Sequence, residues 1–236
     1  MPSKDLQKKI DAIVKKYIEA CRWVEYSKNR LTREGARLYV LQHSLLTRHS
    51  RRAWAYVVGN CPEMEVRRFI VKENLYEEEG IEALSHYLKL VAMGEAVGLK
   101  ARQIHDAVAL PSTRAAFLIW ETLTRDRHWI IGCAAKAALE QSNQDHCGKF
   151  SYHQGHLWMS KLGLSREAVD FWLMHDELDQ VHGTGAFDAV LKFLDSASGV
   201  SEQDVLTAVE DSVLAFNLFF DGIAHAAESQ PRGRAA

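Results

Sequence analysis

The stretch "HDELDQVHG", residues 175–183, lies inside a longer segment whose apolar residues recur with the period of an α-helix. Within it, Asp179 and His182 follow His175 by four and seven positions, so a helix would place the three side chains on one face. A helix face that packs into a protein core does not ordinarily carry three groups able to bind a metal ion. The stretch therefore predicts a helix with a chemical role and requires further ligands from elsewhere in the chain.

Helical periodicity continues through the rest of the sequence, and alternating strand patterns are nearly absent. One helix is predicted from about Thr32 to near Gly59, and another begins just after Pro62. The segment 110–141 has the pattern of one long helix, and Ser201 is a predicted N-cap of the last helix. These patterns predict an all-α fold of seven or eight helices.

The apolar pattern is continuous enough to indicate one helical domain, residues 1–228, followed by a polar tail, residues 229–236, that we expect to be disordered. The 29 Lys and Arg residues nearly balance the 31 Asp and Glu residues. The net charge of −2 therefore gives the chain no overall attraction to nucleic acid or to an anionic membrane. Neither a signal peptide nor a transmembrane segment is evident, which favours a cytoplasmic protein. Four cysteines without metal-binding spacing favour reduced, buried thiols: Cys21, Cys61, Cys133 and Cys147.

Two other segments offer partners for the 175–182 group. Glu79 and His86 are seven positions apart, which would place them on one helix face. Glu140 is the one acidic residue at the end of a small and apolar stretch, residues 129–139. Together with the first group these residues supply three carboxylates and three imidazoles. Facing helices in di-iron bundles present such ligands, with a glutamate such as Glu140 as a bridge.

Plainer interpretations of the same residues exist. Glu77, Glu78, Glu79 and Glu82 could form one solvated helix face. A single histidine such as His86 is commonly a hydrogen-bonded core residue. If all the candidates were scattered in space, the chain would be a helical interaction protein without a catalytic site.

The order Glu79, His86, Glu140 and H-x3-D-x2-H at 175–182 resembles the haem-oxygenase-like di-iron oxidases, relatives of the pyrroloquinoline-quinone synthase and TENA-type proteins. The similarity extends over about residues 15–225, and "NLYEEEG" and "GLSREAVDFWLMHDELDQVH" carry it. The ligand pattern is most similar to that of the death-domain-associated p-aminobenzoate synthase, which consumes its own tyrosine. The first glutamate could be displaced by one residue, to Glu78.

The resemblance implies an up-and-down helical bundle without haem that binds two Fe(II) ions and uses O2 as co-substrate. It implies the metal ligands Glu79, His86, Glu140, His175, Asp179 and His182. An external reductant or electron-donor protein would supply electrons, and a homodimer is common for this fold.

One departure bears on the substrate. The p-aminobenzoate synthase has its substrate tyrosine at the end of the first helix, where "CRWVEYSKNRL" (residues 21–31) places Trp23, with Tyr26 three residues later. The lysine that the synthase needs falls near Phe150, beside Lys149. These mismatches favour an external substrate over self-consumption.

By the same resemblance the favoured reaction is N-oxygenation of a small amine-containing metabolite. Oxidative C–C cleavage or decarboxylation of an amino acid or fatty acid is the first alternative. A metal-independent enzyme like pyrroloquinoline-quinone synthase or TENA is the second. Five residues are candidates for substrate binding: His43, Arg48, Arg114, Trp120 and Tyr152.

Overall fold

The computed structural model describes the chain except for residues 1–3, 82–83, 198 and 231–236, and except for the side chains of residue 4 and residues 176–184. The elements follow in the order α1 (Lys4–Ala20), α2 (Arg22–Arg30), α3 (Arg33–Asn60), α4 (Met64–Phe69), the π-helix η1 (Ile70–Leu75), α5 (Tyr76–Glu79), α6 (His86–Ala96), α7 (Ala101–His105), α8 (Pro111–Arg125), α9 (Trp129–Gln141), α10 (Phe150–Leu162), the 3-10 turn η2 (Glu167–Val169), α11 (Asp170–Phe193), the 3-10 turn η3 (Leu194–Ser196) and α12 (Glu202–Glu228). The predicted all-α fold is confirmed.

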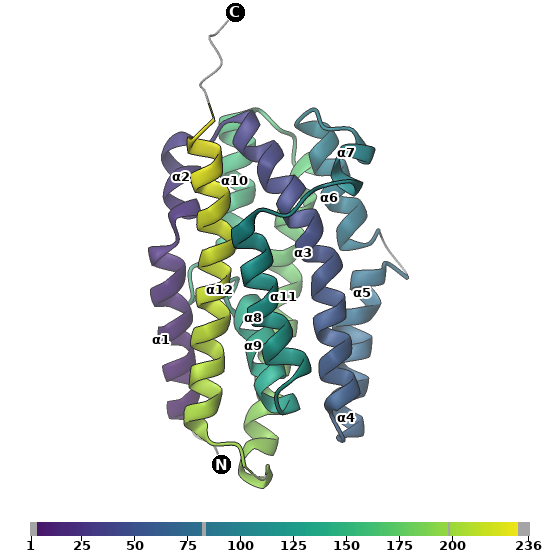
Figure 1. Ribbon diagram of the computed structural model, residues 1–236, viewed down its shortest axis with the longest axis vertical. Coiled ribbons are helices and arrows are strands. Elements are labelled where there is room, and N and C mark those ends of the chain that lie inside the picture. Colours follow the sequence, from purple (N-terminus) through teal and green to yellow (C-terminus); the bar gives the residue numbers. More distant parts are fainter. Residues whose placement is uncertain (1–3, 82–83, 198, 231–236) are drawn as a thin grey trace, which may run out of the picture.

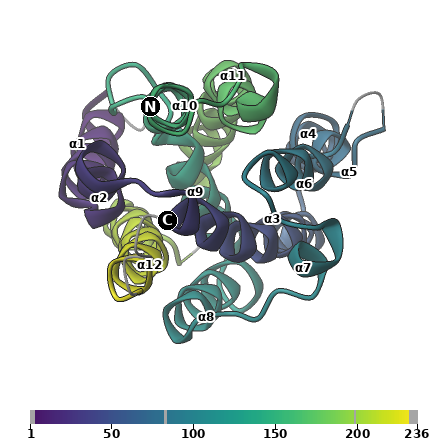
Figure 2. The ribbon, with the colours of Figure 1, turned by 90° about the horizontal axis from the view of Figure 1, so that it is seen from above.

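The long helices run roughly along one axis as an up-and-down bundle (Figure 1). In the part of the chain that the structure describes, seven helices contain 13 residues or more: α1, α3, α8, α9, α10, α11 and α12. Seen from above, α9 lies near the middle of the bundle (Figure 2). It packs against α3, α8, α11 and α12, so side chains on several of its faces are buried.

Two of the predicted helix starts are confirmed by their caps. The Thr32 hydroxyl accepts a hydrogen bond from the Gly35 N–H at 3.1 Å and begins α3. The Ser201 hydroxyl accepts one from the Asp204 N–H, and the Asp204 carboxylate accepts from the Ser201 N–H in return. Such reciprocal bonds satisfy N–H groups that have no partner inside the helix.

The prediction of one long helix over residues 110–141 is wrong. The chain forms α8 and α9 instead, separated at residues 126–128. His128 begins α9 as an N-cap, because its Nδ1 accepts from the Ile130 N–H at 3.3 Å. Arg125 binds Asp126 through two hydrogen bonds at the end of α8. The apolar period runs through this break, so the pattern alone did not reveal it.

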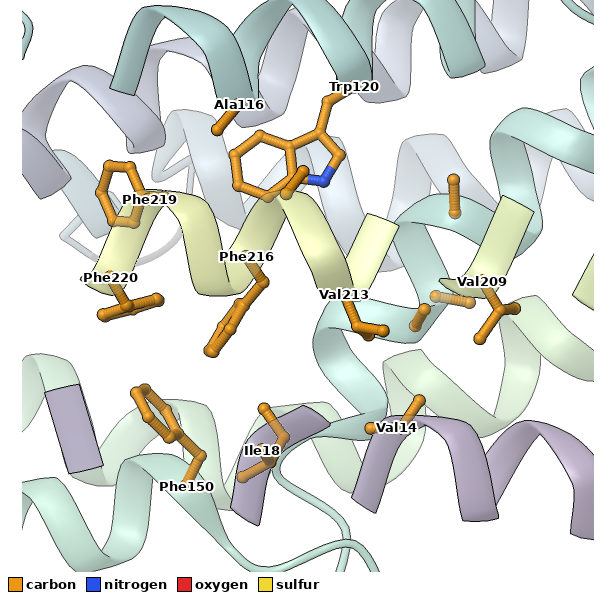
Figure 3. Close-up of a cluster of buried hydrophobic side chains, with 14 of the residues drawn as sticks. Val14, Ile18, Ala116, Trp120, Phe150, Val209, Val213, Phe216, Phe219 and Phe220 are labelled. Atoms are coloured by element: carbon orange, nitrogen blue, oxygen red, sulfur yellow. The ribbon is translucent and has the colours of Figure 1, made fainter. Parts of the chain in front are cut away.

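Aromatic side chains fill the core around α12 (Figure 3). Phe150 of α10 packs edge-on against Phe216 and Phe220, with ring centroids 5.1 and 5.0 Å apart. On the other side of α12, the Trp120 indole donates to the Ser212 hydroxyl at 3.1 Å. Burial of side chains of this size stabilises the fold by about 1.5–3 kcal/mol each, so packing is the main force that holds α12 in place.

The four cysteines are free thiols and are buried, as predicted. No helix in the described part of the chain combines the length and hydropathy that a bilayer crossing requires. The last described helix, α12, ends at Glu228, and most of the predicted tail lies outside the described residues.

Candidate metal centre

A cavity of about 110 Å³ lies in the middle of the bundle. Helices α3, α5, α6, α9 and α11 and the π-helix η1 contribute polar groups to its wall, while α10, α11 and α12 contribute aromatic rings. Among the polar lining residues are His43, Glu78, His86, Lys136, Glu140 and His175. Three of the predicted metal ligands, His86, Glu140 and His175, therefore meet at one place although they come from separate helices.

Helix α9 contributes two charged side chains to the cavity, Lys136 and Glu140, which are four positions apart and hence on one face. The Asn74 amide donates a hydrogen bond to Glu140 Oε1 at 3.1 Å. Lys136 is only 5% exposed. Its ammonium group donates to the Ser50 hydroxyl at 2.8 Å and lies 5.4 Å from the centre of the Trp54 ring. The cavity thus contains a buried cation beside its carboxylates.

Helix α11 contributes His175. Its Nδ1 lies 2.6 Å from the carbonyl oxygen of Phe171, one turn earlier, so Nδ1 carries the proton and donates it. Nε2 is then the nitrogen with the lone pair. Metal-binding histidines are commonly oriented in this way, by a hydrogen bond from the second ring nitrogen to a carbonyl oxygen. The His86 and His175 rings lie beside each other, with centroids 4.8 Å apart.

Helix α5 contributes Glu78, which faces His86, with 3.5 Å between Glu78 Oε2 and His86 Nδ1. Burial alone would raise the pKa of Glu78. The charge and hydrogen bond of His86, the charge of Lys136 and the Ser50 hydroxyl outweigh it, and the net pKa lies below the usual value. Glu78 is therefore held as a carboxylate, the form that can bind a cation.

The residue predicted for this position, Glu79, lies elsewhere. Its side chain is 52% exposed and lies 3.4 Å from the Arg51 guanidinium. The expectation that Glu79 and His86 share one helix face is wrong, because α5 ends at Gly80, which adopts a left-handed conformation with φ 71°. His86 belongs to the next helix, which begins after the N-cap Ser85. The adjacent residue, Glu78, takes the inward position.

The π-helix that precedes α5 determines which of the two adjacent glutamates faces the cavity. A π-turn inserts an extra residue relative to an α-helix, and such turns are frequent at functional sites. In η1 the turn buries Asn74, which is 3% exposed and binds Glu140. Four residues later Glu78 faces the same cavity. No composition signal in "VKENLYEEEG" distinguishes this register from an ordinary helix.

Asp179 and His182 lie within α11, one and nearly two turns after His175. Their side chains are outside the described part of the chain, so their role as ligands stays a prediction.

Of the five residues predicted to bind substrate, His43 lines the cavity. Arg48 donates instead to the carbonyl oxygens of Ser44 and His105. The other three lie away from the cavity lining: Arg114 is exposed, Trp120 is buried between α8 and α12, and Tyr152 is 37% exposed.

Ser50, Asn74 and Lys136 are among the polar cavity residues that were not predicted. Lys136 had a visible signal, because it is the one charged residue in the apolar stretch 129–139. A lysine there must either reach solvent or have a buried role. Ser50 and Asn74 are ordinary polar residues in helical segments, and nothing in the sequence marks them.

The donor set fits iron. Imidazole and carboxylate are the ligands that non-haem iron sites use, and two of each line the cavity: Glu78, Glu140, His86 and His175. The hydrogen bonds of Asn74 to Glu140 and of His175 to Phe171 orient these groups as outer partners of a metal site do. Lys136 adds a positive charge that works against a second cation unless further carboxylates contribute.

Comparison with models of protein families identifies the family of this chain. The model of a family described as "Iron-containing redox enzyme", of haem-oxygenase type, matches residues 37–217. The chain belongs to this family. The matched segment contains Glu78, His86, Glu140 and His175. A search of the curated proteins finds no significant match.

Three solved structures have the same fold as this chain. A domain of unknown function with a haem-oxygenase-like fold from Shewanella denitrificans has a TM-score of 0.77 at 14% identity, covering 99% of this chain and 97% of that chain. A TenA homologue from Pseudomonas syringae pv. tomato has a TM-score of 0.73 at 16% identity, covering 95% and 93%. A TenA homologue from P. horikoshii has a TM-score of 0.67 at 16% identity, covering 95% and 99%. At these identities the similarity demonstrates the fold alone.

Proposed function

We propose that this protein is a non-haem di-iron oxygenase that activates O2 to oxidise a small amine-containing metabolite, by N-oxygenation to a hydroxylamine or nitro product. The observation that carries the proposal is that Glu78, His86, Glu140 and His175, from four separate helices, line one cavity. Helical spacing places Asp179 and His182 on the same face of α11 as His175, and we include them as the remaining ligands. The iron, when bound, would supply the electrons that reduce O2.

The size of the cavity favours a small substrate. Its volume of about 110 Å³ is below the roughly 150 Å³ of an engineered cavity that holds benzene. A long acyl chain would need the bundle to open, whereas a small amine would need little movement. The aromatic part of the wall, with Phe171, Trp172 and Phe216, gives the cavity an apolar surface beside its polar groups, which favours an apolar substrate skeleton.

His43 is suited to bind an amine. Burial, followed by the nearby His175 and His86, lowers its pKa well below the usual value, so the ring is neutral. Its Nδ1 is buried and has no hydrogen-bond partner among the described residues. A neutral imidazole can accept a hydrogen bond from an N–H group and orient the amine nitrogen in the cavity.

Two other activities remain as alternatives. The same centre could carry out oxidative C–C cleavage or decarboxylation of an amino acid, for which Lys136 would be a natural partner of the substrate carboxylate. A metal-independent, TENA-like enzyme is favoured by one specific observation. Despite burial, the charges of His86 and Lys136 already lower the pKa of Glu78, so the carboxylate has electrostatic partners without a metal. In the di-iron enzyme an electron-donor protein would supply reducing equivalents.

The test is an anaerobic titration of the metal-free protein with Fe(II), followed by rapid mixing with oxygenated buffer and optical monitoring. Two irons per chain and a transient visible absorption are expected. Small amines and amino acids are then screened for accelerated decay of that absorption and for oxidised products. Failure to bind iron stoichiometrically would contradict the di-iron centre and favour the metal-independent alternative.

A further inference from the structure

A second cluster of metal-binding groups lies between α1 and the loop that joins α9 to α10, residues 142–149. It consists of Asp11 on α1 and of His146 and Cys147 in the loop, about 135 positions later in the chain. One ligand atom from each of the three residues lies within 4.8 Å of those of the other two. None of the three lines the central cavity.

The Asp11 carboxylate is oriented within this cluster. Its Oδ1 accepts hydrogen bonds from the Gln7 amide at 2.7 Å and from the Gln141 amide at 2.9 Å. Its Oδ2 lies 3.2 Å from His146 Nε2. One oxygen is thus held by two amides while the other faces the imidazole. Carboxylates that bind metal ions are commonly held by outer hydrogen bonds of this kind.

Gln141 gives an independent indication of a ligand. Its side chain is 3% exposed, and its Oε1 is buried without a hydrogen-bond partner among the described residues. The amide nitrogen of the same group contacts Asp11 and lies 3.4 Å from His146 Nε2, so the amide faces both. A buried acceptor without a partner costs about 1–3 kcal/mol. Water bound to a cation in the cluster would donate a hydrogen bond to that oxygen.

We propose that Asp11, His146 and Cys147 form a binding site for a borderline divalent cation of the zinc type. Zinc takes carboxylate oxygen, imidazole nitrogen and thiolate sulfur, usually four ligands in tetrahedral geometry. The fourth position falls to water. As the metal–sulfur bond forms, the Cys147 thiol releases its proton to solvent, and no oxidation or reduction takes place.

The two loop ligands differ in exposure, and this suits capture of an ion from solution. The His146 side chain is 54% exposed, whereas Cys147 is fully buried. Burial, with a further contribution from Asp11, raises the pKa of Cys147 to about 12, so the thiol stays protonated and unreactive until a cation replaces the proton. The bound ion would join α1 to the loop whose Ser142 and Asn143 line the central cavity, and so would fix part of that cavity wall.

Cobalt(II) titration of the full chain tests this site separately from the iron centre. A cysteine ligand gives an intense near-ultraviolet charge-transfer band with cobalt, and none of the residues proposed as iron ligands is a cysteine. We expect one equivalent of cobalt to produce the band. Cys147→Ser should abolish it, and Cys61→Ser, which alters another buried thiol, should leave it unchanged.

His146→Gln is the second variant, because this exposed side chain can be changed without disturbing the core. It should weaken the cobalt affinity by about 10-fold or more. Absence of the band at saturating cobalt, or a band that persists in Cys147→Ser, would overturn the proposal. Neither result depends on whether the central cavity binds iron.

Discussion

The two polar walls of the central cavity are built in different ways. The wall formed by α9 and α11 consists of uninterrupted helices, in which Glu140 follows Lys136 by four positions and His175 follows Phe171 by four. The wall formed by η1, α5 and α6 changes helix type at Leu75, ends a helix at Gly80 and starts again after Ser85. The regular wall orients its ligands by repeat geometry, whereas the irregular wall depends on individual turns.

The largest effect should come from the irregular wall, where two adjacent glutamates have opposite surroundings. Glu78→Gln removes a buried carboxylate that faces His86, and we expect a loss of Fe(II) affinity of at least about 10-fold. Glu79→Gln changes an exposed side chain near Arg51 and should leave the affinity unchanged. Anaerobic Fe(II) titration of the two variants beside the wild type makes the comparison. Equal losses in both would contradict the inward orientation of Glu78.

The contrast between the walls also explains which features the sequence revealed. Helical periodicity was sufficient for the all-α fold and for the caps at Thr32 and Ser201, whereas the family resemblance selected Glu140 and His175, which line the cavity. Periodicity gave a wrong prediction where the α-helix is interrupted. The choice of Glu79 assumed one helix through residue 86, and the left-handed turn at Gly80 removes that assumption.

The break between α8 and α9 was missed for a related reason. Apolar residues on both sides keep the helical period, while a histidine side chain caps the second helix. The buried contacts of Lys136 with Ser50 and Trp54 join residues 86 and 82 positions apart, and no local pattern encodes such pairs.

The second effect concerns the place where the two walls meet. A methyl group added at Gly185 of α11 would lie 2.4 Å from the Phe69 ring, directly before the π-helix. Gly185→Ala should therefore lower the free energy of unfolding by about 1–3 kcal/mol, because the ring must move in a packed interior. Gly59→Ala is the matched control, since nothing lies within 4 Å of the added group. Chemical denaturation measures both, and equal stability of the two variants would contradict the close contact.

A third prediction concerns the protonation of His49, whose pKa is affected by burial and by Lys136 of the regular wall. His49 of α3 is 5% exposed, and burial, followed by Lys136 and Arg52, lowers its pKa to about 3. Glu121 lies 3.5 Å from this imidazole but also binds Arg52 and Arg125, so burial prevails. The unfolded chain binds a proton near pH 6.5, whereas the folded protein does not bind it until about pH 3. Stability is therefore lost as the pH falls below 6.5.

When the pH is lowered from 7 to 5, the uptake of a proton by His49 in the unfolded chain should lower the free energy of unfolding by about 2 kcal/mol. His49→Gln removes the titrating group, so the decrease in stability over this interval should be smaller in the variant than in the wild type by that amount. Urea denaturation at the two pH values measures the difference. An identical decrease in both proteins would mean that His49 is protonated in the folded state.

The smallest predicted effect on stability comes from the left-handed turn at Gly80. Its effect on the free energy of unfolding and its effect on iron binding can be measured separately. Gly80 and Gly163 end α5 and α10 in the same left-handed conformation, with φ 71° and 67°. Alanine at either position should lower the free energy of unfolding by about 1 kcal/mol, because a side chain disfavours positive φ. Only Gly80 lies two residues from a proposed iron ligand, Glu78. If the irregular wall depends on that single turn, Gly80→Ala should weaken Fe(II) binding several-fold while Gly163→Ala leaves it intact. Unchanged iron affinity in both variants would show that the π-helix alone holds Glu78 in place.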